Sequence, residues 1–184
     1  MIKKAAHTNT LLIRKANLSD LDKIEDTYEE HFSYEKEHGA VTVFRKGVYP
    51  TRQDAEKAIN AGTMYVYEEN REIAGSIIVD GKQPEEYQKI AWGCSAVQSE
   101  ITVIHLLMVR PSRKRRGIAA SLVQYAAALA QERSCKAIRL DTGGQNLPAV
   151  SLYKKLGFQV AAAAPMKVGG AIEHSGHLFL EKVL

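Results

Sequence analysis

The feature that most constrains the fold is a stretch in which an apolar run, a basic turn with one glycine and an amphipathic helix follow one another. The run spans residues 104–109, the turn spans residues 111–117, and apolar residues then recur at helical spacing over residues 118–129. A helix that begins at such a turn offers free backbone N–H groups, the positive end of its dipole and cationic side chains. This combination suits a phosphate or pyrophosphate, so we expect an anionic ligand at the turn.

The sequence around this turn separates it from two common nucleotide-binding loops. With a single glycine it is not G-x-G-x-x-G, and it lacks the Gly-Lys-Ser/Thr ending of a P-loop. Residues 114–119 instead are close to the (Q/R)-x-x-G-x-(G/A) turn of the GNAT N-acetyltransferase superfamily. A second and more specific motif of that superfamily, N-x-x-A-x-x-x-Y-x-x-x-G-F, is matched by Asn146, Ala149, Tyr153, Gly157 and Phe158. The chain therefore resembles this superfamily. Residues 49–51, 87–92 and 138–142 resemble in particular a bacterial branch whose acceptors are mostly unassigned.

The resemblance implies that acetyl-coenzyme A (acetyl-CoA) is the donor and that no metal is needed. The backbone of Leu107, Met108 and Val109 would pair with the pantetheine arm like an added strand. Asn146 would face the pantetheine or the acceptor, and Tyr153 would protonate the departing thiolate as a general acid. The pyrophosphate would be bound at the turn, chiefly through backbone amides, by Lys114, Arg115, Arg116, Gly117, Ile118 and Ala119. Arg115 and Arg116 could add charge through the 3′-phosphate.

The general base is open at this point. Members of the superfamily often carry a glutamate at the place that Val103 occupies here, and valine cannot accept a proton. His105 lies two residues later, so strand alternation puts it on the same face, and its ordinary pKa of about 6.5 suits a base. Glu100 and Asp141 are further candidates, directly or through water. The competing interpretation of His105 is a hydrogen-bonded core residue.

Length and composition predict a single domain over residues 1–184, with its core motifs at residues 101–160. An apolar content of 45% and a charged content of 25% are those of an ordinary globular protein, and no apolar run approaches the length of a membrane span. Residues 1–10 are basic and polar rather than a hydrophobic signal region. Two cysteines, Cys94 and Cys135, form no disulfide framework. We therefore expect a cytoplasmic protein that binds no membrane.

The net charge of +4 is concentrated in the basic run over residues 110–116. A nucleic-acid patch is one interpretation of such a run, and a site for a small phosphate ligand is the other. The helix start directly behind the run and the absence of interleaved aromatic residues favour the small ligand. We expect no nucleic-acid partner.

Periodicity and capping signals predict an α/β (α+β) fold, with a mixed sheet of about seven strands flanked by about four helices in the order β-α-α-β-β-β-α-β-α-β-β. A helix is expected to follow a capping box of Ser19 and Asp22, and a second helix to start at Thr51 with Asp54 three residues on. Residues 35–50 are expected to form a loop. Strands are expected at residues 10–15, 63–68, 72–79, 101–109, 137–142, 158–164 and 177–183, and further helices at residues 116–133 and from Pro148.

The leading hypothesis is thus acetyl transfer from acetyl-CoA to an amine by direct attack in a ternary complex. An acyl-CoA-binding sensor without turnover is an alternative, supported by the missing glutamate at Val103, and a basic nucleic-acid binder is a third. The acceptor, a small-molecule or peptide amine, stays open because specificity is expected in the irregular residues 35–50 and 80–99. A homodimer and the use of other acyl groups are also open.

Overall fold

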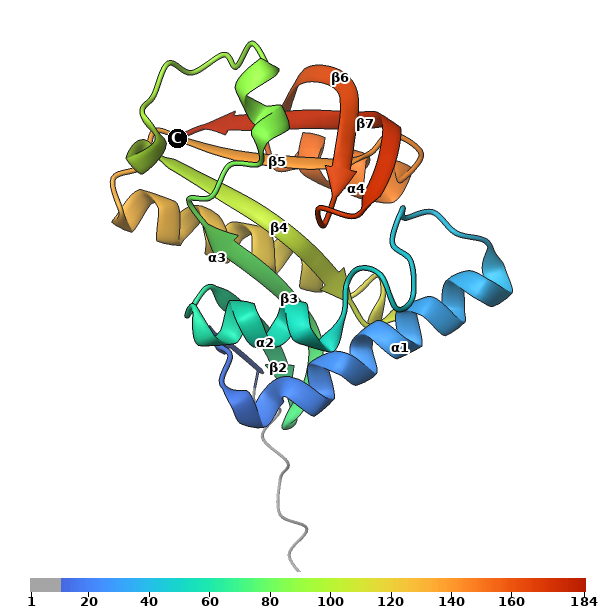
Figure 1. The fold of residues 1–184 in the computed structure, drawn as a ribbon. Helices are drawn as coiled ribbons and strands as arrows, with labels where there is room; N and C mark the ends of the chain where they lie inside the picture. The colour runs from blue at the N-terminus through green and yellow to red at the C-terminus, as the bar shows by residue number, and fades with distance from the viewer. Residues whose placement is uncertain (1–10) are drawn as a thin grey trace, which may run out of the picture.

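The computed structural model describes residues 11–184, and within them a seven-stranded sheet carries four α-helices (Figure 1). The strand order is β1-β2-β3-β4-β5-β7-β6, and only β4 and β5 run parallel. The strands are β1 (Leu11–Lys15), β2 (Met64–Glu69), β3 (Glu72–Asp80), β4 (Ile101–Val109), β5 (Ala137–Gly143), β6 (Gln159–Val168) and β7 (Ile172–Val183). The helices are α1 (Leu21–His38), α2 (Arg52–Asn60), α3 (Ile118–Glu132) and α4 (Leu147–Lys155). The expected order of strands and helices is confirmed.

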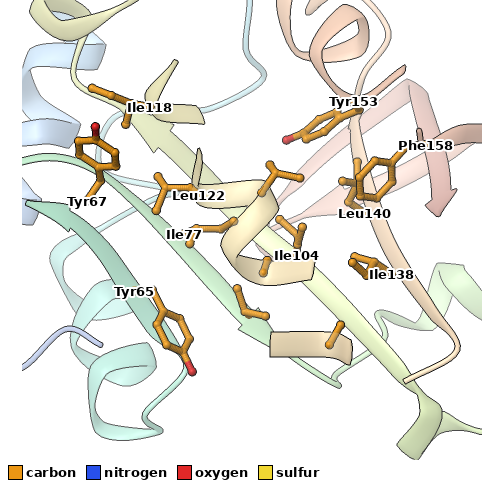
Figure 2. Packing of buried hydrophobic residues seen from close by; sticks show 14 of the residues in the cluster. Tyr65, Tyr67, Ile77, Ile104, Ile118, Leu122, Ile138, Leu140, Tyr153 and Phe158 are labelled. Atoms are coloured by element: carbon orange, nitrogen blue, oxygen red, sulfur yellow. The ribbon is translucent and has the colours of Figure 1, made fainter. Parts of the chain in front are cut away.

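The two faces of the sheet carry separate apolar clusters. On one face α1 and α2 pack against β2, β3 and β4, with Ile24, Tyr28 and Met64 fully buried. On the opposite face α3 and α4 cover the sheet through Leu122, Tyr153 and their neighbours, as Figure 2 shows. A third cluster forms where β6 and β7 meet the segment before β4. The sheet is therefore covered on both sides, and a ligand site must lie at an edge or in a gap.

The start of α1 differs from the expectation. Asn17 and Asp20, not Ser19 and Asp22, form the capping box, and it opens a 3₁₀ turn at Leu18–Asp20 before the α-helix begins. The reason is tertiary, because Asp20 is also held by the Arg14 guanidinium at 2.7 and 2.8 Å. The box of Thr51 and Asp54 at the start of α2 is confirmed. Thr10 and the other residues of the predicted basic N-terminal segment lie outside the described residues.

Two elements run further than expected. Helix α1 continues to His38, into the expected loop, and ends at Gly39, whose φ of 92° favours glycine. Strands β6 and β7 form a long hairpin whose tip, Gly169 and Gly170, has left-handed backbone. The hairpin grows because Met166, Val168 and Ile172 bury their side chains in the third cluster.

The most consequential feature is the divergence of β4 from β5. Within the described chain, the two strands pair only from Ile101–Val103 to Ala137–Arg139. Beyond this point β4 carries a bulge at Leu106, whose φ is 42°, and continues along β3 alone. In Figure 1 the two strands begin side by side and spread apart. A wedge opens between them, and one edge of β4 loses its partner there.

Candidate active site

A cleft of about 1090 Å³ occupies this wedge and extends under the loop that follows α1. It reaches from the turn before α3 to the β6–β7 hairpin. Most of the site residues expected from the sequence line it, namely His105, Leu107, Met108, Val109, Lys114, Arg115, Ala119, Asn146 and Tyr153. Arg116, Gly117 and Ile118 belong to the same turn but do not line the cleft. The structure thus brings the two sequence motifs together around one cavity.

The turn before α3 presents a row of backbone donors. Arg115 and Gly117 both have left-handed backbone, with φ of 63° and 79°, and Gly117 is the N-cap of α3. Ser121 is the first residue of the helix whose N–H finds a backbone acceptor, the Gly117 carbonyl at 2.9 Å. Among the described residues, the N–H groups of residues 115–120 have no acceptor within the chain. Six consecutive donors at the positive end of a helix are an arrangement that suits an anion.

The cationic side chains of the turn divide into two groups. The Arg116 guanidinium donates to Glu69 at 2.9 and 2.6 Å, so it is directed toward the end of β2. Lys114 stands over the Tyr34 ring at 3.7 Å, and partial burial lowers its pKa. Arg115 and Lys114 line the cleft, whereas Arg116 does not. The charge available to an anion therefore comes from Lys114 and Arg115, while Arg116 stabilises the turn.

The edge of β4 that faces the cleft suits an extended ligand. Ser76 pairs with Met108 and Gly75 with Val109 on the β3 side, and β5 has left the other side. Leu107, Met108 and Val109 all line the cleft. A backbone edge without a strand partner can add a chain of amides such as pantetheine by strand-like pairing.

The residues of the motif from Asn146 to Phe158 form helix α4 and its ends, and they position Tyr153 at the cleft. Asn146 caps α4, since its side chain accepts from the Ala149 N–H at 3.3 Å, and Pro148 stands in the first turn as expected. Gly157 ends the helix with φ of 90°, and the Phe158 N–H returns to the Tyr153 carbonyl at 3.0 Å. The Tyr153 and Phe158 rings pack edge to face at 5.7 Å, with the hydroxyl oxygen pointing away from Phe158 (Figure 2).

The environment of Tyr153 keeps its hydroxyl protonated. The residue is only 6% exposed, and burial raises its pKa above the usual 10, with the Asp141 carboxylate adding to the effect. A phenol of this kind holds its proton at neutral pH, as a general acid must before it acts.

The candidate bases occupy different surroundings. Glu100 pairs with Lys136 at 2.8 Å at the start of β4, and it does not line the cleft. His105 lines the cleft, and its Nε2 lies 3.2 Å from Asp80 and 3.1 Å from the Lys82 carbonyl. Asp141, on β5, also lines it, and burial raises the pKa of its carboxyl. Val103 is fully buried in the apolar core.

Sequence reasoning missed two partners of Asp141. The Tyr87 hydroxyl donates to Asp141 Oδ1 at 2.8 Å, and His177 Nε2 lies 3.4 Å from Oδ2. Tyr87 comes from the segment before β4 and His177 from β7. No local motif links these positions, because the register of β5 and β7 places His177 beside Asp141 and the packing of the segment before β4 places Tyr87 there. Among residues 11–184 there is no group of three or more His, Cys, Asp or Glu residues arranged to hold a metal ion, and no helix with the length and apolarity to cross a membrane.

Comparisons with known proteins match the fold of this chain. A Staphylococcus aureus Mu50 protein, named a candidate acetyltransferase, is 28% identical with a TM-score of 0.69, and the alignment covers 94% of this chain and 98% of that one. The yncA protein of Salmonella typhimurium, also named a candidate acetyltransferase and solved with its cofactor acetyl-CoA, is 18% identical with a TM-score of 0.66, over 96% of this chain and 95% of that one.

Among curated proteins, an uncharacterised N-acetyltransferase of Methanocaldococcus jannaschii is 32% identical over 68 residues, which are 37% of this chain. The match spans only 30% of that relative's length. The family model described as "Acetyltransferase (GNAT) family" matches residues 21–158, well over half of the chain. The chain therefore belongs to the GNAT acetyltransferase family.

Proposed function

We propose that the protein transfers an acetyl group from acetyl-CoA to a primary amine by direct attack within a ternary complex. Members of its family use acetyl-CoA, and the Salmonella relative was solved with it. The observation that carries the proposal is that the turn with free N–H groups reaches the cleft at Arg115 and Ala119, and Tyr153 lines the same cleft. An anion site and a proton donor on one cavity are what a CoA thioester requires.

The residues of the cleft fit the parts of the donor in order. The free amides of the turn suit the pyrophosphate, with Lys114 and Arg115 adding positive charge. The open edge of β4 at residues 107–109 suits the amides of pantetheine. The thioester supplies an activated carbonyl carbon, and the line from the turn along β4 directs it toward Tyr153.

The chain's own groups then account for the transfer. The amine nitrogen forms a bond to the carbonyl carbon as the carbon–sulfur bond breaks, and the cleft holds the two reactants together. Backbone N–H groups on the open edge of β4 polarise the carbonyl. A base, His105 or Asp141 directly or through water, takes the ammonium proton before the attack, and Tyr153 gives its proton to the sulfur. The second proton that the nitrogen loses as the amide forms restores the Tyr153 hydroxyl.

The test is release of free CoA thiol with an amine panel of spermidine, L-lysine, kanamycin and a peptide with a free N-terminus. We expect at least one amine to raise release above the background without amine, with an acetylated product identified by mass spectrometry. A mixed amine pool extends the search to other acceptors. Thiol release that no amine accelerates, together with the absence of any acetylated product, contradicts the proposal.

One observation favours a second function, an acyl-CoA sensor without turnover. Val103 stands where the resemblance to the superfamily implies a glutamate, and it is fully buried, so no carboxylate occupies that place. A sensor binds acetyl-CoA tightly in calorimetry and gives no amine-dependent release across the panel. The protonated Tyr153 at the cleft supports the enzyme instead.

A further inference from the structure

Next to the candidate acid lies a chain of buried polar groups that the motifs do not include. His177 is 1% exposed, and its Nε2 lies 3.4 Å from Asp141 Oδ2. Its other ring nitrogen, Nδ1, lies 2.8 Å from Nδ1 of His174. Asp141 and His177 both line the cleft. The register of β5 and β7 explains the meeting, because Asp141 pairs with Phe179 and His177 is two residues from Phe179 on the same face.

The hydrogen positions along Asp141, His177 and His174 follow from one backbone contact. The Gly176 N–H donates to His174 Nδ1 at 3.3 Å, and a backbone N–H is always a donor, so His174 Nδ1 is an acceptor. The short contact between the two imidazoles then requires His177 Nδ1 to carry the hydrogen. Burial, with His174 adding to it, lowers the pKa of His177 to about 4, so the ring is neutral at neutral pH. Neutral His177 thus turns an unprotonated Nε2 toward Asp141.

We propose that Asp141 and His177 together are the base of the acetyl transfer, and this rests on the proposed function. When Asp141 is ionised, its Oδ2 and the unprotonated His177 Nε2, 3.4 Å apart, leave one place for one proton between them. The N–H bond of the substrate ammonium breaks, its electron pair stays on nitrogen for the attack, and the proton is shared by the pair. It returns to solvent through the cleft after the product leaves.

The surroundings favour this pair over His105. His105 Nε2 faces two acceptors, the Asp80 carboxylate and the Lys82 carbonyl, so that nitrogen is a donor. Asp141 and Tyr153 both line the cleft, and the charge of Asp141 raises the pKa of Tyr153, so the candidate acid and base share one cavity. The other titratable groups whose charge or contact acts around the pair are Tyr49, Tyr87, Glu86, His105 and His174.

Two substitutions test the pair by kinetics. Asp141→Asn can still donate to His177 Nε2, and His177→Gln can donate to the Asp141 carboxylate, so each variant keeps a hydrogen bond and loses the proton site. Each should lower kcat about 100-fold with little change in KM, and the double variant should be no worse than the worse single one. Glu173→Gln, an exposed carboxylate on the same hairpin, is the control and should match the wild type.

The pH profile separates a proton-sharing role from a structural one. In His177→Gln the carboxylate keeps a donor but has no partner that shares the proton, so its pKa falls. The acidic limb of kcat/KM should therefore move to lower pH. Two results would overturn the paired base. One is an acidic limb of kcat/KM that stays at the same pH in His177→Gln. The other is a loss of kcat in the double variant that equals the product of the two single losses.

A measurement without turnover completes the test. Long-range ¹⁵N NMR of the wild type should show His177 neutral at pH 7 with its hydrogen on Nδ1, and an Nε2–H tautomer overturns the proposal. His174→Ala should release this tautomer and lower kcat several-fold. A wild type with no amine-dependent thiol release contradicts the proposed function, whereas an active wild type with active Asp141→Asn and His177→Gln variants contradicts only the paired base.

Discussion

The proposed donor side and the proposed base side of the cleft are built in different ways. The donor side comes from one continuous segment, β4 with the turn and the first residues of α3, and its chemistry is mostly backbone N–H groups. The base side joins Tyr87, Asp141 and His177 from three separate segments, and its chemistry is in side chains. A short sequence motif is thus enough to predict a site made of backbone N–H groups. A site made of side chains from separate segments depends on how those segments pack together.

The largest expected effect concerns the donor side. Gly117→Glu forces a residue with a Cβ into φ of 79° and puts an anion beside the free amides. We expect CoA binding to weaken at least about 100-fold, or about 2.7 kcal/mol, in calorimetry. Gly117→Ala is the control for backbone strain alone, since a Cβ there meets no atom within 4 Å. An unchanged dissociation constant for the glutamate variant excludes this turn from the donor site.

Tyr153→Phe tests the point at which the two sides meet. The ring and its contact with Phe158 stay, and only the buried hydroxyl is lost. We expect kcat to fall about 100-fold, within the range of general acid catalysis, while the dissociation constant of CoA stays the same. Tyr125→Phe, a half-buried tyrosine of α3 that does not line the cleft, is the matched control. If turnover of the Tyr153 variant equals that of the wild type, water or another group protonates the sulfur.

Gly169→Ala tests the part of the cleft between the tip of the β6–β7 hairpin and the loop after α1, where we expect the amine to bind. A Cβ at Gly169 would lie 2.3 Å from Cγ of the Tyr49 ring, so the hairpin tip and the loop after α1 must move apart. Tyr49 and Gly169 line the cleft, and we expect KM for the amine to rise about ten-fold with CoA affinity unchanged. Gly170→Ala has a similar φ of 71° and no atom near the added Cβ, so it reports strain alone. Equal effects of the two alanines would assign the change to strain.

The smallest expected effect distinguishes two neighbouring arginines. Arg115→Ala removes a cation from the cleft and should weaken CoA binding about five-fold at low salt and less at high salt. Arg116→Ala removes the main partner of the buried Glu69 and should lower the free energy of unfolding by about 1 kcal/mol, with little effect on CoA. Calorimetry and thermal unfolding measure the two quantities. The reverse pattern would mean that Arg116 releases Glu69 to bind the ligand.

Much of the fold could be predicted, because its signals are local. The order of elements, the capping box of Thr51 and Asp54 and the left-handed cap at Gly157 depend on residues close in sequence. The errors have a common cause in distant contacts. Arg14 draws Asp20 into the capping box at α1, and burial of Met166 and Ile172 lengthens the last hairpin.

The candidate site shows the same division. Most of the positions expected at the donor side line the cleft, and their roles there stay predictions. The sequence offered no reason to prefer Asp141 over His105 as a base. The structure supplies one, since it shows that His105 Nε2 faces two acceptors and that His177 lies beside Asp141.

The sequence by itself determined the strand–turn–helix with its free N–H groups and the helix that carries Tyr153, because spacing along the chain fixes hydrogen bonds between near neighbours. Only the tertiary structure decided that β4 leaves β5 after Val103 and opens the cleft. It also decided that β5 and β7 pair in the register that brings His177 to Asp141. A one-residue shift of that register would turn His177 to the other face of the sheet, and no local pattern in the chain specifies it.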